Sequence, residues 1–122
     1  MTAILERHRR TVRALFWAAA IFSFVMAVLP HPPHFPGEPE DKIKHIAAFA
    51  TMGLLGSLAY SRINPSKLLL WLSLFGAVIE LFQAIPILHR DCDVVDWIAD
   101  TAASGVVILV VNWWRGRALT PR

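Results

Sequence analysis

Two polar residues, Glu80 and Gln83, lie within residues 68–88, a segment otherwise apolar enough to cross a bilayer. A carboxylate there costs a few kcal/mol on insertion scales, so it normally faces the protein interior and has a partner. Gln83 follows Glu80 by three residues and shares roughly the same helix face. A buried carboxylate can accept hydrogen bonds, pair with a cation or transfer a proton. The rest of the chain must supply its partners.

A second group of reactive residues opens an earlier apolar run. Asp41 and His45 are four residues apart and share a helix face, and Lys42 lies three residues before His45. In an enzyme, Glu80 would be the general acid or base, and His45, oriented by Asp41, would be its complement.

Three aspartates form the third group, because Asp93, Asp96 and Asp100 fall within an arc of about 60° on a helix. Carboxylates on one face repel one another unless cations or protons intervene, and Arg90 is one available cation. The predicted ligand-binding residues are Lys42, His45, Glu80, Gln83, Arg90, Asp93, Asp96 and Asp100. These residues form either a satisfied polar plug that locks helices together or a site that binds or reacts.

Several kinds of site are disfavoured. Carboxylate oxygens and one imidazole are possible metal donors, but no HExxH or His-rich spacing occurs, so we expect no metal and no cofactor. The single cysteine, Cys92, excludes a paired-thiol redox site and a Cys-rich zinc site. Ser73 and Ser104 lack the elbow motif of a serine nucleophile.

The elements that position these residues follow from composition. Of the 122 residues, 56% are hydrophobic and 17% are charged, and long uncharged runs alternate with short charged stretches. This pattern is typical of a polytopic membrane protein. We predict one all-α domain, a bundle of four transmembrane helices. The predicted spans are residues 14–30, 42–61, 68–88 and 94–114.

The connections and the start of the chain refine this prediction. A cleaved signal peptide is the rival interpretation of the first span, but no small-x-small cleavage site precedes the prolines. Residues 30–40 hold five of the eight prolines and are expected to form an outer loop. Asn64-Pro65 breaks the chain before the third helix, and Ser66 is the expected N-cap.

The distribution of charge predicts the orientation. With four spans, both termini share one side, which collects nine of the twelve basic residues. The positive-inside rule therefore places both termini in the cytoplasm. The three polar groups then lie toward the outer face. No nucleic-acid partner is expected, because the basic residues are explained as flanks of the spans.

Three blocks carry a resemblance to a known family. They are Asp41-Lys42-x-x-His45-x-x-x-Phe49, Gly76-x-x-x-Glu80-x-x-Gln83 and Arg90-x-x-Asp93-x-x-Asp96. Together they resemble the VanZ-like family of small bacterial membrane proteins, over about residues 41–105. The family usually has Asn four residues after the last Asp and Gly soon after, where this chain has Asp100 and Ala103.

The resemblance implies a four-helix membrane protein acting at the outer face of a bacterial membrane, and the founding member is associated with low-level teicoplanin resistance. We expect the chain to contact the lipid bilayer and to bind a cell-wall precursor, a glycopeptide or a membrane-protein partner. The alternative is an intramembrane enzyme acting on a lipid head group or lipid phosphate, with Lys42 and Arg90 holding the anionic substrate.

Overall fold

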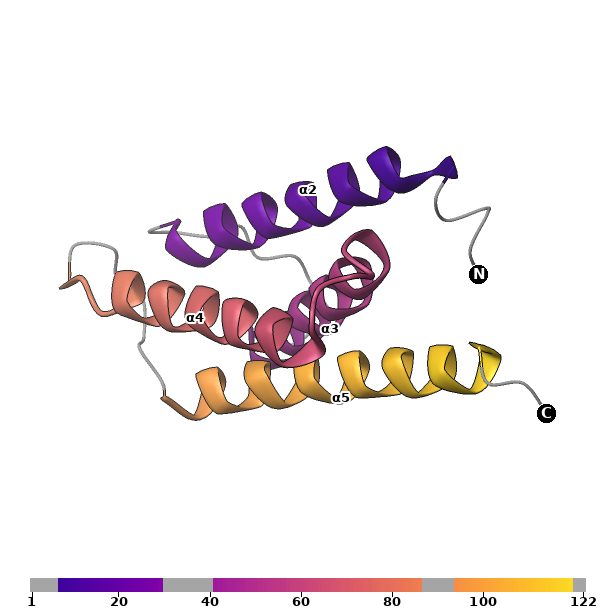
Figure 1. Ribbon diagram of the computed structural model, residues 1–122. Coiled ribbons are helices and arrows are strands. Elements are labelled where there is room, and N and C mark those ends of the chain that lie inside the picture. The colour runs from indigo at the N-terminus through magenta and orange to yellow at the C-terminus, as the bar shows by residue number, and fades with distance from the viewer. Residues whose placement is uncertain (1–6, 30–40, 87–93, 120–122) are drawn as a thin grey trace.

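The computed structural model describes residues 7–29, 41–86 and 94–119, with side chains for all but 41, 42 and 117–119. This part of the chain is all helical. Its helices are α2 (Arg9–Val28), α3 (Asp41–Ala59), α4 (Pro65–Gln83) and α5 (Val94–Leu119). The all-α prediction is confirmed for these residues. Helix α2 begins and helix α5 ends at the same end of the molecule (Figure 1).

Three helices are long and apolar enough to cross a membrane: α2, α4 and the Val94–Gly116 part of α5. Their outward faces carry large apolar side chains, such as Phe22, Trp71 and Leu109, which are 66%, 68% and 65% exposed. Apolar side chains covering the outside of a helix are expected where lipid, rather than water, is the solvent. The structure therefore supports a membrane protein with three candidate spans.

Helix α3 differs from the span predicted at residues 42–61. The part of α3 with described side chains, Ile43–Ala59, is apolar but shorter than the three candidate spans. It covers about 25 Å at 1.5 Å per residue, against a hydrocarbon core of about 30 Å. Helix α3 packs against all three other helices and lies behind them in Figure 1. A fourth span remains a prediction.

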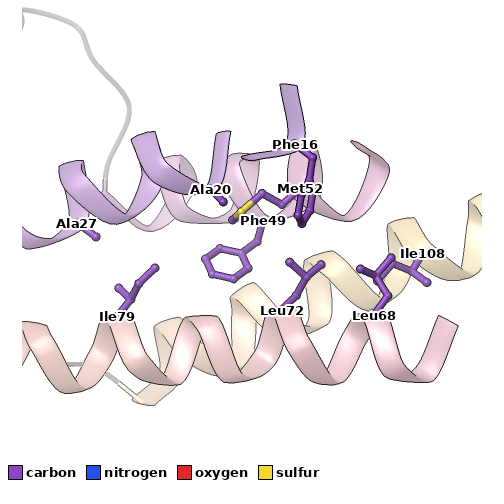
Figure 2. Close-up of a cluster of buried hydrophobic side chains, with 9 residues drawn as sticks. All are labelled: Phe16, Ala20, Ala27, Phe49, Met52, Leu68, Leu72, Ile79 and Ile108. Carbon is purple, nitrogen blue, oxygen red and sulfur yellow. The ribbon is translucent and has the colours of Figure 1, made fainter. Parts of the chain in front are cut away.

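The core is built from apolar side chains that all four helices contribute (Figure 2). Phe49 and Met52 of α3 are 2% and 0% exposed, at the centre of this cluster. Gly53 brings α3 close to α5, since a Cβ added there would lie 3.2 Å from the carbonyl oxygen of Ser104. Small residues that let two backbones approach are a common device of membrane helix packing.

The structure gives the bounds of α4 and corrects the prediction of its N-cap. The helix begins at Pro65 and ends at Gln83, with Ala84 as its C-cap just ahead of Pro86, and the membrane span of residues 68–88 remains a prediction. The N-cap is Asn64, and the prediction of Ser66 was wrong: the Asn64 side chain accepts a hydrogen bond from the Ser66 backbone N–H at 2.9 Å. Proline at the first helical position moves the cap one residue before it.

Candidate functional site

His45 of α3, Glu80 of α4 and Asp100 of α5 meet between the helices, and we refer to them as the three-helix cluster. One nitrogen or oxygen atom of each lies within 4.8 Å of the others. His45 Nδ1 and Asp100 Oδ2 lie 3.8 Å apart. All three residues are among the predicted ligand-binding residues. The side chain of Asp41, the predicted partner of His45, lies outside the described residues.

Burial makes this cluster unusual. The Asp100 side chain is 2% exposed and that of His45 is 17% exposed, while Glu80 is 6% exposed as a residue. Asp100 Oδ1 and His45 Nδ1 are buried and have no hydrogen-bond partner within the described residues. Most buried polar atoms in folded proteins are hydrogen-bonded, so an exception calls for an explanation. The charges of Asp96 and Glu80 both act unfavourably on a charged Asp100.

The cluster lies near one end of the helices because α3 and α5 begin there and α4 ends there. His45 is four residues into α3, Asp100 is six residues into α5, and Glu80 precedes the end of α4 by three residues. At 1.5 Å per residue these positions are about 6, 9 and 5 Å from the helix ends. The cluster is thus buried in protein yet only one or two helical turns from the end of the packed helices.

The other predicted site residues are not brought together in the same way. Gln83 is 2% exposed and donates a hydrogen bond from Nε2 to the Ala27 carbonyl of α2, at 3.0 Å, so it fastens α4 to α2. Asp96 is half-buried, one turn before Asp100 on α5. The remaining predicted residues lie outside the described side chains: Asp41, Lys42, Arg90 and Asp93.

Sequence analysis missed a set of polar contacts beside the cluster. Ser73 Oγ and Thr101 Oγ1 are 3.1 Å apart, and Trp97 Nε1 donates to the Ser73 carbonyl at 2.9 Å. Ser104 Oγ donates to the Phe49 carbonyl at 3.2 Å. Hydroxyl-bearing residues in apolar helices favour helix–helix interfaces, and this preference could have predicted that these side chains make contacts between helices. These contacts tie α5 to α4 and α3, so they hold Asp100 in place.

Positive charge gathers at the opposite end of α3. Arg13 Nε donates to the Ala59 carbonyl at 3.2 Å, and its guanidinium lies 4.7 Å from the Tyr60 ring centroid. Arg115 Nη2 donates to the Ser57 carbonyl. Cations are favoured at helix C-termini because the last carbonyls carry partial negative charge. His45 and Ala59 are 14 residues apart in α3, about 21 Å, so the carboxylates and these arginines lie well separated.

Comparison of the chain with models of protein families, with curated proteins and with solved structures gave no match. The resemblance to the VanZ-like family therefore remains a prediction from its three sequence blocks.

Proposed function

We propose that this chain is an integral membrane protein of the bacterial envelope, VanZ-like in its sequence blocks, that binds an envelope ligand through the three-helix cluster. One observation carries the proposal: Asp100 is 98% buried as a side chain, yet one of its oxygens has no hydrogen-bond partner within the described residues. A polar plug that only locked helices together would satisfy its buried groups, because unsatisfied ones cost stability. Unused hydrogen-bonding capacity instead suits a ligand.

The cluster's chemistry narrows the class of ligand. Glu80 and Asp100 accept hydrogen bonds, and His45 can donate or accept. Cell-wall precursors and glycopeptides both carry many hydroxyl, amide and amino groups, and such donors complement two carboxylates. A ligand of this type would enter from the near end of the helices, since the cluster is only one or two turns from it. A link to glycopeptide resistance belongs to this proposal.

Binding is tested with the full chain in nanodiscs, titrated with a lipid-linked cell-wall precursor and, separately, with teicoplanin. Wild type is expected to bind one of them, and Glu80→Gln is expected to weaken binding about tenfold, the effect of losing one charged hydrogen bond. Lys67→Gln is the matched control, because it removes one charge from an exposed position on the same helix. Equal binding by wild type and Glu80→Gln would contradict the proposal.

The proposed orientation places the cluster toward the outer face and both termini in the cytoplasm. Two arginines support it, because Arg13 of α2 and Arg115 of α5 contact carbonyls at the end of α3 remote from the cluster. Of the lysines and arginines with described side chains, only Lys44 lies at the cluster end of α3. Positive residues concentrate on the cytoplasmic side of membrane proteins. An alkaline-phosphatase fusion at about residue 36 is expected to be active, and an inactive fusion there would refute this topology.

An enzyme is the second candidate, favoured by the approach of His45 to Asp100 at 3.8 Å beside Glu80. A histidine held between two carboxylates has the components of a general acid–base site, and such contacts often tighten only when substrate binds. The substrate would be a lipid head group or lipid phosphate. In that case Glu80→Gln should abolish turnover while leaving helical content and substrate binding intact, which separates catalysis from binding alone.

A further inference from the structure

The three-helix cluster has the composition of a metal-binding site. Its donors are one imidazole nitrogen and carboxylate oxygens from two residues, all within 4.8 Å of one another. Each comes from a different helix, so the chain shows no local ligand spacing. The lack of an HExxH motif argues against a metal site formed within one short stretch of the chain. It does not exclude a site formed by residues from three different helices.

Electrostatics favours a cation among these residues. Glu80 and Asp100 are both buried, and Asp96 adds a third carboxylate one turn away on α5. Buried charges in proteins are normally paired or coordinate a metal. Arg13 and Arg115 contact carbonyl groups at the far end of α3, and Lys44 is the only lysine or arginine with a described side chain at the cluster end of α3. A dication would give Asp100 Oδ1, which is buried without a hydrogen-bond partner within the described residues, an electropositive neighbour.

Geometry and donor type select the class of ion. Tetrahedral Zn²⁺ with bonds of about 2.0–2.1 Å needs donors about 3.4 Å apart. The His45–Asp100 separation of 3.8 Å is already close to that, and the 4.8 Å limit is about 1.4 Å wider than needed. Small rotations of His45 and Glu80 side chains close such a gap. Ca²⁺ prefers about six to eight oxygen donors, and Mg²⁺ a near-ideal octahedron, so a site with imidazole suits neither as well.

We propose that His45, Glu80 and Asp100 bind one divalent first-row transition-metal ion, for which Zn²⁺ is the probe. Three protein ligands leave at least one coordination position open, as in zinc sites that bind water or substrate. This metal site deepens the proposed function. It rests on that function only because both assign a binding role to the three-helix cluster. An open position would take an oxygen atom of the envelope ligand.

The test is direct metal binding by the full chain in nanodiscs, stripped with EDTA, washed and incubated with Zn²⁺, without any envelope ligand. Metal content after equilibrium dialysis is expected to reach one zinc per chain. His45→Gln and Asp100→Asn are each expected to lower the affinity for zinc by about 100-fold. Asp96→Asn is expected to lower it by about tenfold, because Asp96 lies one turn away from the proposed ligands. His8→Gln is the matched control, because it removes an imidazole from the start of α2 and should leave binding unchanged.

Cobalt substitution keeps the test independent of whether the variants fold. Co²⁺ bound to the wild type in a four-coordinate nitrogen–oxygen site gives intense visible absorption, and Zn²⁺ should displace it. Substoichiometric zinc, weak octahedral cobalt bands, or His45→Gln binding as tightly as wild type would each overturn the metal proposal. If zinc fails to bind while the cell-wall precursor or teicoplanin binds, only the metal proposal fails. If zinc binds while neither the cell-wall precursor nor teicoplanin binds, the proposed function fails and the metal proposal stands.

Discussion

Asp100→Asn is expected to raise the free energy of unfolding of the metal-free protein. In the folded state the Asp100 and Glu80 carboxylates approach within 4.8 Å. Two unit charges at that separation repel by about 3 kcal/mol at an effective dielectric constant of about 20. Asparagine has nearly the same shape and no charge, so it removes this repulsion. After side-chain relaxation, we expect a gain of about 1–3 kcal/mol.

The assay is reversible unfolding in mixed micelles, followed by tryptophan fluorescence and circular dichroism, with EDTA present. Gln83→Leu is the comparison variant. It removes the hydrogen bond from Gln83 to the Ala27 carbonyl and is expected to lower the free energy of unfolding by about 1 kcal/mol.

The two variants should therefore move stability in opposite directions. Gln83 donates a hydrogen bond that holds α4 to α2. Asp100, in contrast, has an oxygen without a hydrogen-bond partner within the described residues, and under the proposed function it is retained for binding at a cost in stability. A loss of about 1 kcal/mol or more in Asp100→Asn would refute this reasoning, since that is the cost of breaking a satisfied buried contact. The cluster would then be a polar plug that holds α3, α4 and α5 together.

Two further predictions concern packing and capping. Gly53→Ala should lower the free energy of unfolding by about 1–3 kcal/mol, because the added Cβ would lie 3.2 Å from the Ser104 carbonyl oxygen, on backbone that cannot rotate away. In the same unfolding assay Gly105→Ala, whose Cβ meets only a leucine side chain at 3.6 Å, should be neutral or stabilising by up to about 1 kcal/mol; equal effects at the two glycines would refute the close approach. Asn64→Ala should cost about 1 kcal/mol through loss of the N-cap. Ser66→Ala should stay within about 0.5 kcal/mol, and the reverse ranking would return the cap to Ser66.

Hydropathy and local spacing predicted much of the architecture. Uncharged runs marked the helices α2, α4 and α5, because lipid requires long apolar segments and leaves little room for other structure. The boundaries were less well predicted. Asn64 was missed as the N-cap even though the cap is a local feature, because the proline after it was read only as a break.

The amino-acid sequence by itself determined that Glu80 is an anomaly, since a carboxylate in an apolar helix is costly whatever the fold. It also indicated His45 and Asp100 as members of nearby polar groups. Only the tertiary structure decided that these two meet each other at 3.8 Å, and that Gln83 turns to α2. The physical reason is that helical periodicity defines which residues share a face. Which faces meet depends on the rotation and crossing of helices, set by contacts such as that between Gly53 and α5.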